Sequence, residues 1–206
     1  MRLKLLPPLS LALLLLFSAH FSRAQVVAAA HASAPLPITI GSGFSEFNPD
    51  WNHGHLMGGA LWIDYTPEFL PGPLHGLGIE AEVRRLSLGY NASNGPINRE
   101  DVASGGVLYS WTHLNRFRPY GKFLMGYGNA YWNGKQPGYR VHQSRTVTTV
   151  GGGAEVQAFH RVWARVDYEY QWWPDFFAVD TPGQGSLSPQ GFTLGVSYHF
   201  HQLSSR

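Results

Sequence analysis

The chain has 206 residues, of which 14% are charged and 14% are aromatic, and glycine occurs 24 times. This composition is too apolar for a disordered chain and too rich in glycine for a helical bundle. The formal net charge of +2 comes without a run of charges, which argues against a nucleic-acid-binding surface. The absence of cysteine excludes disulfides, thiolate metal sites and cysteine nucleophiles.

The N-terminus has the pattern of a secretory signal. Arg2 and Lys4 precede an apolar segment over residues 5–17, and a short polar stretch follows it and ends at Ala24. The apolar segment is shorter than the roughly 20 residues that a membrane-spanning helix needs. We therefore predict a signal peptide over residues 1–24, cleaved after Ala24.

Residues 25–37 are small and end in proline, which is typical of an N-terminal tail. Apolar and polar residues then alternate over residues 38–200, and this period of two indicates strands of a single β domain. Residues 201–206 form a short polar C-terminal tail. The alternation and the loop residues between its runs predict eight strands, over residues 38–47, 57–66, 77–89, 102–114, 118–132, 143–159, 162–173 and 191–200.

The segment over residues 162–173 is the most informative of these. Apolar residues such as Val166 and Tyr168 alternate with charged residues such as Arg165 and Asp167. In a soluble sandwich, the charged face meets water and the apolar face meets a core. In a membrane barrel, the apolar face meets lipid and the charged face meets the lumen.

Strand length and connections favour the membrane barrel. Soluble strands have about 5 to 6 residues, whereas a tilted membrane strand needs about 9 to 11. Long polar loops follow the first, third, fifth and seventh predicted strands, and short turns follow the fourth and sixth. The connection over residues 67–76 is an exception because it carries three prolines. The apolar faces also end in rings suited to membrane interfaces: Tyr65, Trp111, Tyr131, Trp172 and Tyr198.

The fold expected from these patterns is all-β, an eight-stranded antiparallel up-and-down transmembrane β-barrel. A soluble sandwich or a lipocalin-like barrel with an aromatic core is the alternative. The interior of an eight-stranded barrel is just wide enough for side chains to fill. We expect a salt-bridge network of both charge signs to plug this lumen, although a charged ion path is an alternative. The inward residues expected to form it are Glu80, Glu82, Arg84, Lys122, Arg145, Glu155, Arg165, Asp167 and Glu169.

Two segments resemble a known family. FRPYGKFLMGYG over residues 117–128 and GFTLGVSYHF over residues 191–200 look like strands of the OmpA-type outer membrane β-barrel domain, a small eight-stranded family of Gram-negative bacteria. The resemblance implies an outer-membrane location after signal-peptide export. It also implies that the barrel-insertion machinery recognises the last strand through Leu194, Val196, Tyr198 and Phe200. The tail over residues 201–206 departs from the family pattern, and no peptidoglycan-binding domain follows.

Three local motifs contain residue types that occur in catalytic, metal or phosphate sites. His142, Ser144 and Glu155 do not form a triad, because eleven residues at about 3.3 Å each separate the serine from the acid along one strand. His53 and His55 lack a nearby third metal ligand. The glycines at 151–153 lack the lysine and helix of a phosphate loop.

We therefore predict no catalytic residue, metal or cofactor. The expected protein is a monomeric outer-membrane barrel with a structural or adhesive role, carried by loops over residues 90–101 and 174–190. Its expected partners are outer-membrane lipid and the insertion machinery, with no nucleic acid. A lipid-modifying enzyme and a narrow pore stay open as alternatives.

Overall fold

A computed structural model of the chain describes residues 37–50, 54–91, 95–114, 116–133, 140–177 and 184–200. The predicted signal peptide and C-terminal tail lie outside these residues, and only Pro37 of the predicted N-terminal tail is described. The strands found in the described part are β1 (Ile38–Asn48), β2 (Leu56–Tyr65), β3 (Leu77–Asn91), β4 (Gly95–Ser110), β5 (Phe117–Asn133), β6 (Arg140–Gln157), β7 (Val162–Phe177), β8 (Gln184–Leu187) and β9 (Gln190–His199).

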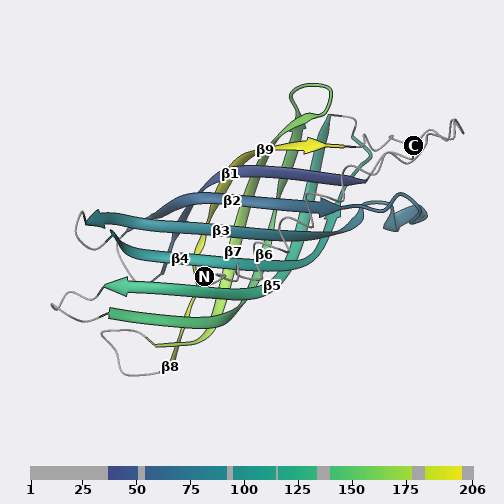
Figure 1. Ribbon diagram of the computed structural model, residues 1–206. Coiled ribbons are helices and arrows are strands. Elements are labelled where there is room, and N and C mark those ends of the chain that lie inside the picture. The colour runs from purple at the N-terminus through teal and green to yellow at the C-terminus, as the bar shows by residue number, and fades with distance from the viewer. Residues whose placement is uncertain are drawn as a thin grey trace, which may run out of the picture. The chain divides into compact units, whose positions relative to one another are not determined.

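Eight of these strands close into a barrel (Figure 1). Strands β1 to β7 pair in chain order, and β9 pairs with both β7 and β1, so the ring is complete. All of these pairings are antiparallel. The short strand β8 pairs with the end of β7 only. The predicted fold class is confirmed, and the predicted eighth strand corresponds to β9.

Strand β7 shows how the sequence divides the wall into two faces. Val166, Tyr168 and Tyr170 are 43 to 47% exposed, whereas Arg165 and Asp167 are at most 2% exposed. Because successive side chains of a strand point to opposite faces, the apolar residues cover the outside and the charged residues line the lumen. The faces predicted for this segment are confirmed. The soluble alternative, with an aromatic core inside and charges outside, is wrong.

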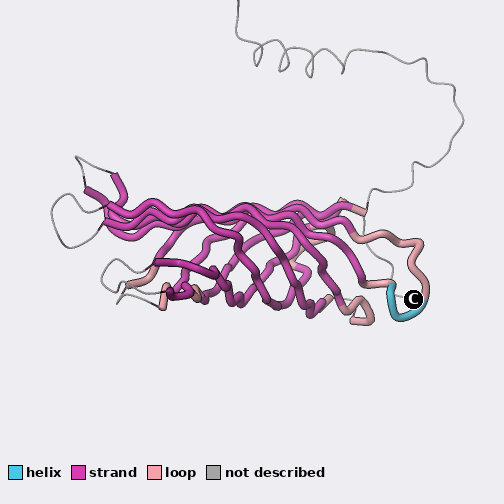
Figure 2. The backbone as a smooth tube through the Cα atoms, turned by 90° about the horizontal axis from the view of Figure 1, so that it is seen from below, coloured by secondary structure: helices cyan, strands magenta, loops and turns pink. Residues whose placement is uncertain are grey.

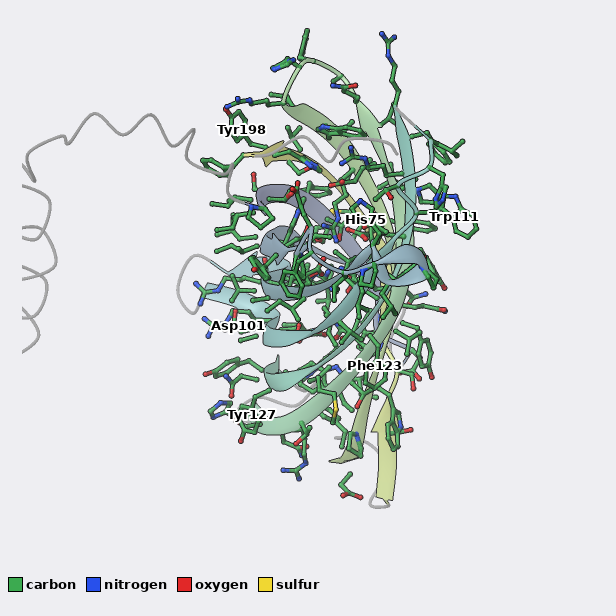
Figure 3. The ribbon with its side chains drawn as sticks, turned by 90° about the vertical axis from the view of Figure 1, so that its right-hand side faces the viewer. His75, Asp101, Trp111, Phe123, Tyr127 and Tyr198 are labelled. Atoms are coloured by element: carbon green, nitrogen blue, oxygen red, sulfur yellow. The ribbon has the colours of Figure 1, made fainter. Side chains whose placement is uncertain are left out.

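Exposed aromatic rings lie on the outer face of the wall. Figure 3 looks along the barrel and labels Trp111, Phe123, Tyr127 and Tyr198 on its outside. The predicted interface residues Tyr65, Trp111, Trp172 and Tyr198 are all exposed. Tyr131 is half-buried because its ring stacks on His142, with 4.2 Å between the ring centroids.

The barrel has two ends that differ in their connections. The Ile38 end holds the start of β1, the end of β9 and the connections over residues 66–76, 111–116 and 158–161. The first of these connections contains the short 3-10 helix Gly72–Leu74, drawn in cyan in Figure 2. At the opposite end, called the Asn48 end, β3, β4, β5 and β6 extend into long hairpins. No helix in the described part of the chain has the length and apolar character that a membrane-spanning helix needs.

The described parts of the two polar segments predicted as long loops are largely strand, so this part of the prediction is wrong. Strand β3 runs to Asn91 and β4 starts at Gly95, which leaves only residues 92–94 between them. Similarly, β7 continues past Pro174 to Phe177, and β8 pairs with this extension. Turn-forming residues are compatible with a strand here because a neighbouring strand supplies a ladder of hydrogen bonds.

The extension of β7 contains an irregularity at Asp175. This residue has a φ of 53°, a left-handed conformation that aspartate tolerates better than most residues. The pairing with β8 shifts register between Trp173 and Phe176. A bulge changes which face each later side chain meets. As a result, Trp173 and Phe176 are both fully buried, although strict alternation would place them on opposite faces.

Candidate functional site

The middle of the lumen contains a group of charged side chains and one tyrosine that we call the lumen cluster. Its members come from β2, β3, β5 and β7 and are all buried. The strand alternation turns each of them inward. The lumen cluster consists of Asp64, Glu80, Glu82, Arg84, Tyr120, Lys122, Arg165, Asp167 and Glu169.

Arg165 is the centre of one half of the lumen cluster. Its Nη2 lies 2.6 Å from Glu80 Oε2, and its Nη1 lies 3.1 Å from Asp64 Oδ2. Its Nε donates to Asp167 Oδ2 at 2.9 Å and to the Tyr120 hydroxyl at 2.7 Å. The Tyr120 hydroxyl in turn donates to Asp167. A single guanidinium thus joins three carboxylates from three strands. Arginine is suited to this role because its planar guanidinium carries several N–H donors that point in different directions.

Lys122 is the centre of the other half. Its Nζ lies 2.9 Å from Glu80 Oε1, 2.8 Å from Glu82 Oε2 and 2.7 Å from Glu169 Oε1. Arg84 Nη2 completes this half, at 2.6 Å from Glu82 Oε1 and 2.7 Å from Glu169 Oε1. Glu80 contacts both Lys122 and Arg165, so the two halves form one connected network.

Burial makes these ion pairs energetically important. Charges in a low-dielectric interior need partners, and removing one partner of such a pair typically costs about 3 to 5 kcal/mol. The cluster has three cations and five carboxylates, so every cation contacts more than one carboxylate. The network therefore ties β2, β3, β5 and β7 together across the interior.

Glycines make room for the large side chains beside the cluster. Trp62 lies against Arg165, with 4.6 Å between the guanidinium carbon and the ring centroid. A Cβ at Gly41 would lie 2.3 Å from the Trp62 ring, and one at Gly195 would lie 2.4 Å from it. Only glycine fits at both positions, because any larger residue would displace this ring. Glycines of β1 and β9 thus set the place of Trp62, which covers Arg165.

Eight of the nine residues predicted for the lumen network are buried in the interior. Seven of them belong to the lumen cluster, and Glu155 lies in a second group at the Ile38 end. Arg145 is the exception. It pairs opposite Gly128 and lies six residues along β6 from Gly151, which is opposite Lys122. At about 3.3 Å per residue, this separation is roughly 20 Å.

Arg145 instead supports the irregular end of β7. Its Nε donates to the carbonyl oxygen of Asp175 at 2.9 Å, and its Nη1 donates to the carbonyl oxygen of Ser144 at 3.0 Å. The prediction that Arg145 joins the lumen network is therefore wrong. Its face was assigned correctly, but the position along β6 places it at the Asn48 end.

The prediction also omitted buried polar residues of the interior, among them Asp64, Glu100, Arg118 and Tyr120. Asp64 and Tyr120 belong to the lumen cluster, and Arg118 and Glu100 lie near it. The alternation in β2 and β5 places Asp64 and Tyr120 on the inward face, so the sequence alone indicates that both side chains point into the lumen. Glu100 was assigned to a loop because the residues around it are polar.

A serine, a histidine and an acid lie together at the Ile38 end. Ser197 Oγ donates to Glu155 Oε1 at 2.7 Å, and His199 Nε2 lies 3.1 Å from Glu155 Oε2. The same His199 Nε2 is 3.5 Å from Ser197 Oγ. In a catalytic triad, one ring nitrogen accepts the serine proton and the other bonds the acid. Here a single nitrogen makes both contacts and the serine bonds the acid directly, so the contacts differ from those of a catalytic triad.

The residues of the other motifs have different contacts where the structure describes them. Ser144 Oγ donates to Asn129 Oδ1 at 2.5 Å, far from Glu155 along β6. His53 lies outside the described residues, and His55 Nδ1 lies 3.0 Å from Glu46 Oε1. Within the residues that the structure describes, no group of three or more histidine or acidic side chains has an arrangement suited to a metal ion.

Apolar side chains fill the interior toward the Asn48 end. One buried group consists of Phe47, Leu56 and Leu86. A larger group brings β7 and β8 against β4, β5 and β6, and its members are Val102, Ala130, Trp132, Val147, Trp173, Phe176 and Leu187. A Cβ at Gly128 would lie 2.2 Å from the Trp173 ring, so this glycine makes room for the tryptophan.

A closed antiparallel barrel with an apolar outer face and an ion-paired interior defines the class of outer-membrane β-barrel proteins. Residues 9–200 match the family described as outer membrane protein beta-barrel domain. The match spans most of the chain, and the chain belongs to this family of outer-membrane proteins. No curated protein sequence matches the chain.

Solved structures of small outer-membrane barrels are similar to this one. Neisserial surface protein A is 11% identical with a TM-score of 0.55, covering 79% of this chain and 95% of its own. OprG from Pseudomonas aeruginosa is 13% identical with a TM-score of 0.51, covering 80% and 95%. Ail, the attachment invasion locus protein of Yersinia pestis, is 18% identical with a TM-score of 0.49, covering 78% and 95%. At these identities the likeness to Neisserial surface protein A and OprG shows the fold alone. Together with the family match, it confirms the expected resemblance to small eight-stranded outer-membrane barrels.

Proposed function

We propose that this outer-membrane barrel is closed to ions and serves as a rigid support for adhesive or ligand-binding hairpins at its Asn48 end. The observation that carries the proposal is the lumen cluster, whose charged side chains from four strands meet across the interior. Because eight strands enclose only enough space for side chains, such a network leaves little room for a water-filled path.

Both ends of the interior support a closed lumen. At the Ile38 end, a cavity lined by Asp64, Arg118 and Glu155 has a volume of only ≈ 20 Å³, which is room for about one water. At the Asn48 end, the buried rings of Trp173 and Phe176 form an apolar constriction. Apolar constrictions oppose the passage of ions because they dewet.

Conductance in planar bilayers tests the closed lumen. We expect the folded, purified protein to give no steady channel openings in a membrane where a large porin conducts. The double variant W173A/F176A removes the apolar constriction. We expect this variant to give no channel openings either, because the lumen cluster is intact. Its folded state is checked by heat-modifiable migration on gels. Steady openings from the unmodified protein would make it a pore.

The direction of the barrel is testable because the chain has no cysteine. Asn48 is exposed at one end of the barrel and His113 is exposed at the other. If the hairpins of the Asn48 end face outward, a membrane-impermeant maleimide labels N48C on intact cells and leaves H113C unlabelled. The opposite labelling pattern would place the hairpins in the periplasm, where they have no access to external ligands.

We also propose that the barrel is not an enzyme. The geometry of Ser197, His199 and Glu155 supports this, since the serine bonds the acid rather than the histidine. Purified protein incubated with phospholipid and lipid A is expected to leave both unchanged in mass. Lipid hydrolysis that is lost in S197A would contradict the proposal.

The last strand supports a proposal about assembly. Leu194, Val196, Tyr198 and Phe200 are all exposed on the outer face. We propose that the insertion machinery recognises this face and that the inserted barrel acts as a monomer. F200S is expected to lower the folded fraction in cells while purified protein refolds in detergent as before. Equal folding in cells would exclude this role for Phe200.

A further inference from the structure

A polar patch interrupts the apolar outer wall toward the Asn48 end. We call it the Arg85 patch, and its members are Arg85, Arg99, Asp101, Asn129 and Ser144. Arg85 pairs opposite Asp101, Asp101 opposite Asn129, and Asn129 opposite Ser144, so four of the members form one row across β3 to β6. The adjacent outward row toward the Ile38 end consists of Val83, Ala103, Tyr127 and Thr146. The change in polarity between the two rows marks the level of a membrane interface.

Two guanidinium groups share one carboxylate in this patch. Arg85 Nε donates to Asp101 Oδ1 at 2.6 Å, and Arg99 Nη2 lies 2.8 Å from Asp101 Oδ2. The Arg99 guanidinium carbon also lies 4.4 Å from the ring centroid of Tyr131. Two cations with one anion leave a net positive charge. The Arg85 side chain is 72% exposed, so its remaining donors face the surroundings of the barrel.

A shallow apolar groove begins beside Arg85. It is lined by residues that include Gly59, Leu61, Val83 and Tyr127, and Arg85 and Asp101 form its polar rim. Figure 3 places Asp101 and Tyr127 on the same outer side of the wall. Gly59 has no side chain to fill the groove, and a second hollow lined by Phe44, Gly59 and Leu61 adjoins it. The surface therefore combines a cationic rim with an apolar floor.

We propose that the Arg85 patch binds the phosphate headgroup of an anionic lipid in the surrounding leaflet, with one acyl chain of that lipid lying in the groove over Gly59. Guanidinium donors match phosphate oxygens in geometry and charge, and Asp101 holds both arginines in place. The acyl chain covers outer-wall residues that face hydrocarbon. The site does not depend on whether the lumen is closed or on what the hairpins bind.

Lipid retention by the full-length folded protein tests the site. The protein is equilibrated with equal amounts of phosphatidylglycerol and phosphatidylcholine in detergent, and bound lipids are counted by native mass spectrometry. We expect preferential retention of phosphatidylglycerol, and retention about twenty-five-fold weaker in R85Q/R99Q, since each arginine contributes about a factor of five. The control R161Q removes an exposed arginine at the Ile38 end and is expected to retain the lipid. Equal retention in R85Q/R99Q, or equal loss in R161Q, would overturn the proposal.

A second variant separates a lipid from a free phosphate. G59L fills the groove and leaves both arginines in place. A Cβ at Gly59 meets its nearest atom at 3.7 Å, an ordinary contact, so this variant is expected to fold, with heat-modifiable migration as the check. We expect its retention of phosphatidylglycerol to fall about tenfold through lost acyl contacts. Full retention of phosphatidylglycerol in G59L would show that no acyl chain lies in the groove, and displacement of the lipid by millimolar inorganic phosphate would show that the patch binds phosphate without the lipid. Either result would overturn the proposal.

Discussion

Ion pairs occur on both faces of this barrel wall, in the lumen cluster and in the Arg85 patch. The shortest ion pair in each region has the same length, because Arg165 Nη2 lies 2.6 Å from Glu80 and Arg85 Nε lies 2.6 Å from Asp101. The surroundings differ, since the Arg165 side chain is 1% exposed and the Arg85 side chain is 72% exposed. A buried pair is shielded from water and salt, whereas an exposed pair readily exchanges its partners for both. Position in the wall, rather than distance, is expected to set the energy of each pair.

Removing the central cation of the lumen cluster is expected to have the largest effect. R165M leaves Asp64, Glu80 and Asp167 without their shared guanidinium, and we expect a loss of about 3 to 5 kcal/mol in the free energy of unfolding. Urea unfolding in lipid vesicles, followed by tryptophan fluorescence, measures it. The control R161M changes an exposed arginine at the Ile38 end and should stay within about 0.5 kcal/mol. Equal effects of the two variants would mean that the lumen cluster does not stabilise the fold.

The outer face of the same strand gives the next largest effect. V166R places a cation where the wall meets the hydrocarbon, and it should cost about 2 to 4 kcal/mol near the midplane. The control T146R lies on the outer face of β6 beside the polar patch, where the cost should be about 0 to 1 kcal/mol. The same unfolding assay compares them. An unchanged free energy of unfolding in V166R would contradict the assignment of this face to lipid.

The alternation in the sequence predicted these two faces because the direction of a side chain is a local property of a strand. Arg165 and Val166 are adjacent and meet different media, and no knowledge of other strands is needed to separate them. The position of a residue along the barrel axis is different, because it depends on the stagger of every strand pair. Arg145 was therefore given the correct face but the wrong position.

The positions of the strand ends were the other source of error. They explain why Glu100 was assigned to a loop and not to the interior. Its neighbours Asn98, Arg99 and Asp101 are polar, so the segment had the composition of a loop. In the structure, β3 and β5 pair on either side of this segment, and their hydrogen bonds make it a strand. The pairing is set by distant residues that composition does not report.

The third prediction compares two buried glutamates. Glu169 Oε1 contacts Arg84 and Lys122, each at 2.7 Å, whereas neither carboxylate oxygen of Glu100 has a hydrogen-bond partner in the described part of the chain. E169Q weakens two charge-assisted bonds and should cost about 1.5 to 3 kcal/mol. E100Q removes a charge without breaking a hydrogen bond and should cost less than about 1 kcal/mol. Unfolding free energies that rank the two variants in the reverse order would show that Glu100 holds the tighter contacts.

The smallest effect is expected for the exposed pair of the Arg85 patch. A double-mutant cycle with R85Q and D101N in zwitterionic lipid measures its coupling energy, which should be about 0.2 to 1 kcal/mol despite the 2.6 Å contact. The coupling should also fall between low salt and 1 M salt, because the screening length shortens from tens of ångströms to about 3 Å. The matching cycle with R165M and E80Q should give a larger coupling that does not change with salt, because ions do not enter the buried cluster. A salt-dependent coupling inside the lumen would mean that ions reach Arg165, and the interior would then be open to the solution.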